Sequence, residues 1–141
     1  MSSPTVEIDL VVFDSDGRVL LVRASPNDDW ATPCGNLLAN EYVHTGSARI
    51  ARDMLGIAFC PQRVLGCYQE TGDGSSNVPG KIKFAVSTTL EGSSVRRINL
   101  HLSEGMNGET HWWEPATVLA ARDVAPATKN FFTPSPWNKI L

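Results

Sequence analysis

Residues 30–57 constrain the fold of this chain more than any other part of the sequence. The stretch begins as a loop with proline, glycine and asparagine residues. It continues as a predicted helix over Val43–Leu55, which Gly56 ends because glycine readily takes the left-handed backbone of a helix C-cap. Glu41 and Arg49 flank the start of this helix with opposite charges. We expect the two side chains to pair and to hold the loop against the helix.

The spacing in this stretch resembles the signature of the Nudix hydrolases, the superfamily of MutT-like enzymes. The glycine, glutamate, arginine, glycine and aliphatic residue of that signature match Gly35, Glu41, Arg49, Gly56 and Ile57. Trp30 and Pro33 lie where many members have a W-x-x-P-G-G lead-in. The resemblance covers nearly all 141 residues. It therefore implies a single domain over 1–141 of the α/β class, a Nudix-type α/β/α sandwich around a mixed β-sheet.

Three positions that carry glutamates in the family pattern match Ile50, Asp53 and Met54, so one carboxylate remains there. The resemblance implies an enzyme that splits a diphosphate with the help of divalent cations, and Mg²⁺ prefers oxygen ligands. The changes therefore indicate a degenerate Nudix box. Asp53 and Glu109 are the candidate metal ligands that remain. Glu104 is a further acidic residue, and like Glu109 it lies in the segment before Trp112.

Ile50 and Met54 lie on one apolar stripe of the predicted helix, at about 100° of rotation per residue. We expect this stripe to be exposed, next to the face that packs on a sheet, and to need cover from a loop, a ligand or a second subunit. A homodimer is therefore one expected assembly. Glu41 and Arg49 are expected to form a structural pair, and with Asp53 they are also the candidate catalytic residues.

Aromatic residues and the altered box positions are the candidate ligand contacts, because aromatic rings stack on nucleobases and other flat groups. We expect a small, nucleotide-like molecule to bind among Trp30, Ile50, Met54, Phe84, His111 and Trp112. Three functions stay open. The first is a ligand- or partner-binding protein with lost or impaired diphosphate hydrolysis. The second is an active, atypical hydrolase of nucleoside-diphosphate derivatives that uses Mg²⁺ or Mn²⁺. The third is a repurposed metal-free enzyme that uses Cys34, His44 or His111.

The amino-acid composition narrows the class of protein and the kinds of partner to expect. Hydrophobic residues make up 42% of the chain and charged residues 19%, which suits one globular core. A net charge of −3 disfavours general nucleic-acid binding. The three cysteines have no CxxC spacing, so a structural zinc site is not expected. No segment approaches the roughly 20 apolar residues of a membrane span, and no signal peptide is evident, so we expect a cytoplasmic protein with no membrane association.

Local patterns predict further elements on both sides of the central helix. Residues 5–23 are typical of a β-hairpin with a turn at residues 14–17. The remaining predictions are a loop at 25–40, a strand within 57–69, a connection at 71–80, a strand at 81–86, a turn at 91–94, a strand at 111–113, a helix from 115 to about 122, a short helix ending near 130–132, and an irregular tail from 133.

Overall fold

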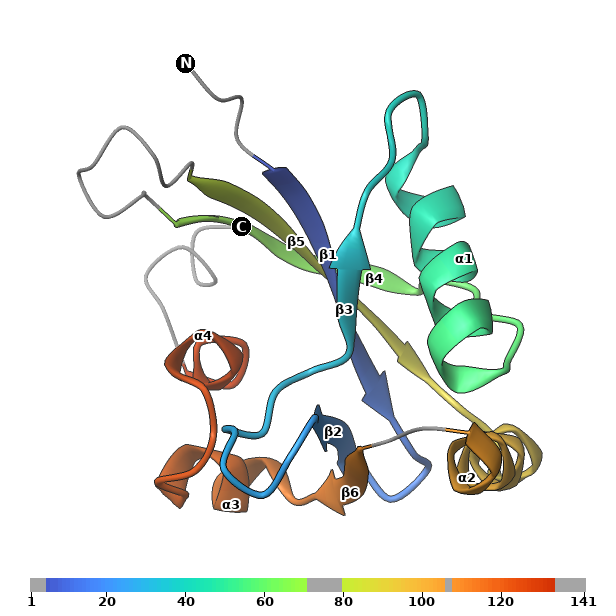
Figure 1. The fold of residues 1–141 in the computed structure, drawn as a ribbon, viewed down its shortest axis with the longest axis vertical. Coiled ribbons are helices and arrows are strands. Elements are labelled where there is room, and N and C mark those ends of the chain that lie inside the picture. The colour runs from blue at the N-terminus through green and yellow to red at the C-terminus, as the bar shows by residue number, and fades with distance from the viewer. Residues whose placement is uncertain (1–4, 71–79, 106–107, 134–141) are drawn as a thin grey trace.

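A computed structural model of the chain describes residues 5–70, 80–105 and 108–133. A six-stranded mixed sheet runs through the molecule, and helices cover both of its faces (Figure 1). The strands are β1 (Thr5–Phe13), β2 (Val19–Arg23), β3 (Cys34–Asn36), β4 (Arg63–Glu70), β5 (Lys81–Thr89) and β6 (Glu109–Trp113). The helices are α1 (Val43–Leu55), α2 (Gly92–Gly105), α3 (Pro115–Ala120) and α4 (Pro126–Lys129). The predicted α/β/α sandwich around a mixed sheet is confirmed.

The central strand of the sheet is β1. It pairs in parallel with β5 along its whole length. Its other edge pairs antiparallel with β3 over Glu7–Asp9 and with β2 at Phe13. The strand order β4-β5-β1-β2-β6 leaves β4 and β6 at the two ends of the path. One face of β1 packs against α1 and α2 through Ile8 and Leu10, and the opposite face packs towards α3 through Val11.

The turn between β1 and β2 is held by Asp14. One oxygen of its carboxylate accepts the backbone N–H groups of Asp16 at 3.0 Å and Arg18 at 2.8 Å. The other oxygen accepts Nε of Arg18 at 2.8 Å. Gly17 has a φ of +81°, which glycine adopts without steric cost. The predicted hairpin over residues 5–23 is confirmed.

Helix α1 begins and ends where the sequence predicts, and Gly56 closes it with a φ of 70° and an N–H bonded to the Arg52 carbonyl. The expected exposed stripe is wrong. Ile50 is only 3% exposed and Met54 packs against the same core, because α1 presents one broad buried face to the sheet. The stripe is covered within the chain, so it no longer gives a reason to expect a second subunit.

Two local predictions are corrected. The expected loop at residues 25–40 contains β3, which forms because its backbone pairs with β1. The expected turn at residues 91–94 is instead the start of α2, where the N–H of Ser94 bonds to the Glu91 carbonyl at 3.0 Å. Serine and glycine favour turns and helix starts alike, so the pattern was ambiguous. Tertiary packing of the fully buried Ile98 accounts for the helix.

The last helices both begin at prolines, as proline at the first helical position favours. Helix α3 ends at Ala120, and α4 covers the predicted last short helix. The expectations for the connection at 71–80 and for the tail beyond Thr133 lie largely outside the described residues. Among the helices that the structure describes, none is long and apolar enough to cross a membrane.

Candidate functional site

The join between β3 and α1 is clamped by Arg49. Its Nε donates to Glu41 at 2.8 Å and its Nη2 donates to the other oxygen of the same carboxylate at 3.0 Å. Nη2 also donates to the carbonyl of Asn36 at 2.8 Å. The Glu41 carboxylate accepts the N–H of Leu38 as well. The predicted structural pair is therefore confirmed, and both of its members are occupied in holding the loop.

The pH dependence of this clamp can be predicted. The hydrogen bonds from Arg49, followed by the N–H of Leu38, lower the pKa of Glu41 from 4.5 to about 2. A carboxylate whose pKa is lowered by folding stabilises the folded state above its unfolded pKa, and this contribution is lost as the pH falls through its folded pKa. Glu41→Gln should therefore lower the melting temperature most at neutral pH, and the difference from the natural protein should shrink from pH 4.5 towards 2.

Thermal melts of both proteins at a series of pH values check this prediction. Asp29→Asn in the exposed loop before Trp30 is the matched control and should follow the natural protein at every pH. A deficit in Glu41→Gln that stays constant across the acid range would show that the charge is not what matters.

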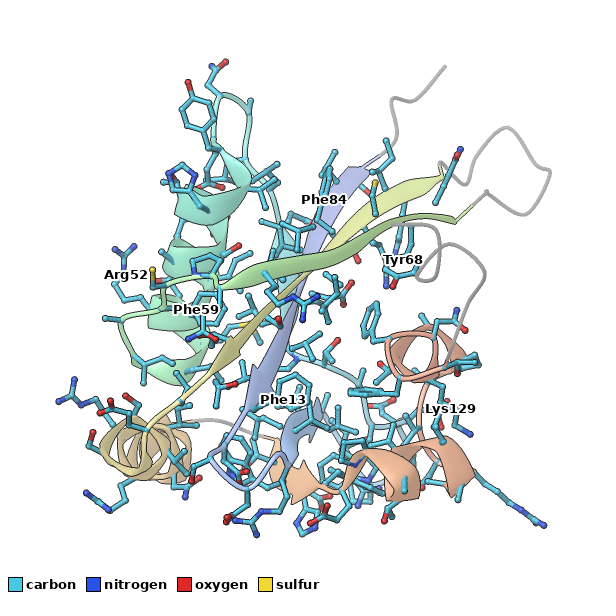
Figure 2. All side chains as sticks on the ribbon, turned by 180° about the vertical axis from the view of Figure 1, so that it is seen from behind. Phe13, Arg52, Phe59, Tyr68, Phe84 and Lys129 are labelled. Atoms are coloured by element: carbon cyan, nitrogen blue, oxygen red, sulfur yellow. The ribbon has the colours of Figure 1, made fainter. Side chains whose placement is uncertain are left out.

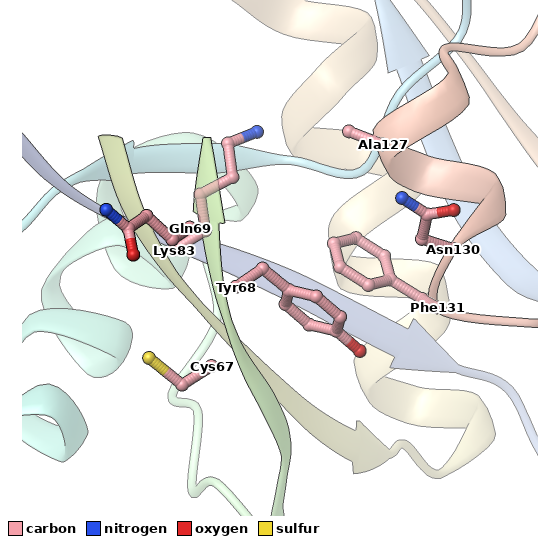
Figure 3. A pocket seen from close by; sticks show the side chains of 7 residues that line it. All are labelled: Cys67, Tyr68, Gln69, Lys83, Ala127, Asn130 and Phe131. Carbon is pink, nitrogen blue, oxygen red and sulfur yellow. The ribbon is translucent and has the colours of Figure 1, made fainter. Parts of the chain in front are cut away.

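A cavity of about 290 Å³ lies between the edge strand β4, its neighbour β5 and α4. We call it the sheet pocket, and its lining residues are Cys67, Tyr68, Gln69, Lys83, Ala127, Asn130 and Phe131 (Figure 3). The rings of Tyr68 and Phe131 meet at 5.4 Å between centroids. Sequence reasoning missed this pocket, because its residues come from three separated segments without a motif. Only the aromatic and amide character of those residues could have marked them.

The sheet face that bears Lys83 carries paired charges. Nζ of Lys83 lies 3.7 Å from a Glu7 oxygen and 4.0 Å from an Asp9 oxygen, and Nζ of Lys81 lies 3.3 Å from Glu7. Asp9 is only 3% exposed, and it accepts the hydroxyl of Thr32 at 3.1 Å. The register places these groups on neighbouring strands, since Glu7 is paired with Lys83 across β1 and β5.

Asp9 also influences two protonatable groups nearby. Burial, then Asp9 and then Glu7 raise the pKa of the Cys34 thiol. Burial and then Asp9 raise the pKa of the Tyr68 phenol. A raised thiol pKa reduces the thiolate that a nucleophile needs, so this environment does not activate Cys34. His44 is exposed and stacks on Tyr42, with ring centroids 5.8 Å apart.

Two further cavities lie elsewhere on the surface. One of about 500 Å³ runs along β4 from Arg63 to Tyr68 and shares Phe131 with the sheet pocket. The other, of about 400 Å³, lies at the end of α1 between Arg52 and Phe59. Figure 2 shows Phe59 beside α1, whereas Tyr68 lies towards α4, so the last cavity is remote from the sheet pocket.

Comparisons with known proteins find similarity in the fold of this chain and none in its sequence. No family model matches the sequence, and no curated protein matches it. The fold, in contrast, is similar to a MutT protein from Methanosarcina mazei Go1, with a TM-score of 0.68 at 16% identity over 94% of this chain and 93% of that one. It is also similar to a NUDIX hydrolase from Nitrosomonas europaea, with a TM-score of 0.66 at 20% identity over 92% and 86% of the two chains.

The chain has the Nudix fold. A third similar structure is the NUDIX domain of Shewanella oneidensis NrtR complexed with ADP ribose, with a TM-score of 0.61 at 15% identity over 94% of this chain and 86% of that one. That ligand is a property of NrtR. The Gly35–Ile57 stretch, which resembles the Nudix signature in sequence, forms part of β3, a loop and the helix α1.

The residues of this Nudix helix do not fit the divalent metal that the family resemblance implies. Asp53 has a side chain that is 60% exposed, and it forms an ion pair with Arg52 at 3.5 Å. Glu109 lies on β6, where it forms an ion pair and a hydrogen bond with Arg23. Among the described residues, no three histidine, cysteine, aspartate or glutamate side chains gather where they could hold a metal. The side chain of Glu104 lies outside the described part of the chain.

The predicted ligand contacts divide between the two faces of the sheet. Trp30 and His111 lie 6.4 Å apart between ring centroids, on the side of the sheet where α3 packs. Trp112 packs on the opposite core and donates its Nε1 to Asn99 at 3.3 Å. Phe84 pairs with Ile8 in the sheet register, so it faces the side of α1. Ile50 and Met54 belong to that same core, on the side of the sheet opposite Trp30 and His111.

Proposed function

We propose that this Nudix-fold chain binds a small, nucleotide-like molecule in the sheet pocket and has lost or strongly impaired metal-dependent diphosphate hydrolysis. The observation that carries the proposal is the position of Ile50. In the family pattern this position is a glutamate of the metal site, and here it is a buried aliphatic residue. A Cβ added at Gly35 would lie only 2.9 Å from Cγ1 of Ile50, which reflects how closely β3 and α1 approach there.

The donor chemistry of the helix supports the loss of activity. Divalent cations such as Mg²⁺ are held by carboxylate oxygens together with water and substrate phosphates. An isoleucine and a methionine supply no such oxygen at two of the three positions. The remaining Asp53 is turned to solvent beside Arg52. Glu41 is engaged by Arg49 through two hydrogen bonds and is not free to move to a metal.

The sheet pocket supports retained binding. Its volume of about 290 Å³ lies near the lower limit of ligand pockets, which span about 300–1,000 Å³. Tyr68 and Phe131 offer aromatic surface to a flat ring. Asn130 carries an amide that both donates and accepts hydrogen bonds, as a nucleobase edge requires.

A hydrolysis panel with Mg²⁺ or Mn²⁺ tests the first half of the proposal. The substrates are nucleoside triphosphates, nucleotide sugars, ADP-ribose and dinucleoside polyphosphates, and the readout is release of phosphate or nucleoside monophosphate. We expect no turnover above the protein-free blank. Metal-dependent turnover would overturn the proposal in favour of an active, atypical hydrolase. Turnover that survives EDTA would favour a metal-free enzyme.

A thermal-shift screen of small molecules in EDTA tests the second half. A ligand at one hundred times its Kd should stabilise the folded state by about 2.7 kcal/mol. Ala127→Leu, which fills the sheet pocket, should abolish the shift. Ala116→Leu makes the same change at an exposed position of α3 and should retain it. Absence of any metal-free ligand, or equal shifts in both variants, would contradict binding in this pocket.

A further inference from the structure

Lys83 is the one charged side chain among the described residues that line the sheet pocket, and it is already neutralised. It lies between Glu7 at 3.7 Å and Asp9 at 4.0 Å. Lys81 is likewise paired with Glu7. Among the side chains that the structure describes on this sheet face, two carboxylates thus balance two ammonium groups. Within the described lining, an incoming phosphate would find no uncompensated cation to offset the loss of its hydration.

Tyr68, which lines the sheet pocket, responds to the same charges. The pKa of its phenol is raised, first by burial and next by the charge of Asp9. Burial and the Asp9 carboxylate disfavour the phenolate, and they disfavour another anion at this place for the same reasons.

The other polar side chains that line the described pocket are uncharged at neutral pH. The amide of Asn130 and the hydroxyl of Tyr68 can donate and accept hydrogen bonds. Phe131, opposite Tyr68, supplies an apolar wall (Figure 3). Arg63, a further cation on β4, lines the neighbouring cavity along that strand and not the sheet pocket.

We propose that the sheet pocket selects an uncharged heterocycle, a free nucleobase or nucleoside, over the corresponding nucleoside diphosphate. This inference rests on the proposed function, which makes the sheet pocket the ligand site. Hydrogen-bonding edges and aromatic surface supply the affinity. The two ammonium groups of Lys81 and Lys83, balanced by the carboxylates of Glu7 and Asp9, leave no net positive charge to attract the phosphates. An active Nudix hydrolase would bind a diphosphate. The charge of the preferred ligand therefore distinguishes an active hydrolase from the binding protein proposed here.

Calorimetric titration of the full chain in EDTA tests the selection. Adenosine, guanosine, cytidine and uridine are each compared with their own 5′-diphosphates. We expect at least one nucleoside to bind about tenfold more tightly than its diphosphate, a difference of about 1.4 kcal/mol. Equal affinities, tighter binding of the diphosphate, or no binding of any nucleoside would overturn the inference.

A charge added at the pocket rim gives a second, independent test. Asn130 lines the pocket and is exposed, so Asn130→Lys should fold normally. It should raise the affinity for the diphosphate about tenfold relative to that for the nucleoside, because one uncompensated cation then faces the phosphates. Asn27→Lys in an exposed loop adds the same charge elsewhere and should leave the ratio of the two affinities unchanged. Asp9→Asn should act in the same direction as Asn130→Lys.

The two proposals fail in different ways. If the EDTA screen finds an anionic ligand whose binding Ala127→Leu abolishes, the sheet pocket remains the site and the selection for uncharged ligands is wrong. If no molecule binds, or if Ala127→Leu has no effect, the proposed function itself is contradicted. Failure of Asn130→Lys to improve diphosphate binding relative to nucleoside binding would show that charge does not govern the selection.

Discussion

Replacing Ile50 with glutamate is expected to lower the free energy of unfolding by about 4 kcal/mol at neutral pH. Loss of a fully buried aliphatic side chain accounts for about 2 kcal/mol of this. Burial would also raise the pKa of the new carboxyl, at a cost of about 1.4 kcal/mol for each pKa unit above its ordinary value. Ile50 is 3% exposed in the core beneath α1, so the new side chain has little access to water. Urea denaturation measures the difference.

The matched controls separate charge from volume. Ile50→Val should cost only about 0.5–1.5 kcal/mol. The deficit of Ile50→Glu should shrink towards about pH 5, because a carboxyl whose folded pKa is raised destabilises the folded state most when the pH lies above that pKa. An Ile50→Glu protein within about 1 kcal/mol of the natural protein would contradict the core assignment. It would mean that the side chain reaches solvent and that this position is still open to a metal.

The burial of Ile50 bears directly on restoring the family's chemistry. Reintroducing the glutamates of the box at Ile50 and Met54 is the obvious way to rebuild a metal site. Because Ile50 packs against Gly35, we expect the double variant to lose stability and to gain no hydrolysis. Recovery of Mg²⁺-dependent turnover in a folded double variant would show that only the ligands, and not the packing, had been lost.

Replacing Trp30 with alanine is expected to cost about 3–5 kcal/mol of stability, as large buried aromatic residues do when truncated. Trp30 is 8% exposed, and its ring contacts Trp113 with centroids 5.7 Å apart. The guanidinium of Arg23 lies 4.4 Å from the centre of the Trp30 ring and adds a cation–π contact. The backbone bridge from Trp30 to Val124 further joins the segment before β3 to the segment after α3. Urea denaturation again measures the loss.

The same residue was a predicted ligand contact, and two variants test that role. Trp30→Phe keeps a ring in the core and should retain both folding and binding by calorimetry. Leu38→Ala removes an exposed hydrophobic side chain and should change stability by less than about 0.5 kcal/mol. A Trp30→Phe protein that folds normally but no longer binds the ligand would restore Trp30 to the binding site.

Short-range chemistry explains why much of the fold could be predicted. The hairpin follows from Asp14 and Gly17, whose side chain and backbone freedom make the turn without help from the rest of the chain. The end of α1 follows from Gly56 in the same way. The pairing of Glu41 with Arg49 could be predicted from their spacing across one loop and the first turns of the helix. Helix α2 was missed because its start has the residues of a turn.

The candidate site also has one part that local sequence predicts and one part that depends on long-range packing. Residue identity and short spacing were enough to predict the Nudix-like loop and helix, the clamp at the start of the helix, and the apolar Ile50 and Met54 where the family pattern has glutamates. The packed structure was needed to show that Ile50 is buried and that Tyr68, Lys83 and Asn130 meet in one pocket. Burial and pocket formation depend on contacts between strands and helices far apart in the chain. Their geometry is set by how whole elements pack, which no local pattern records.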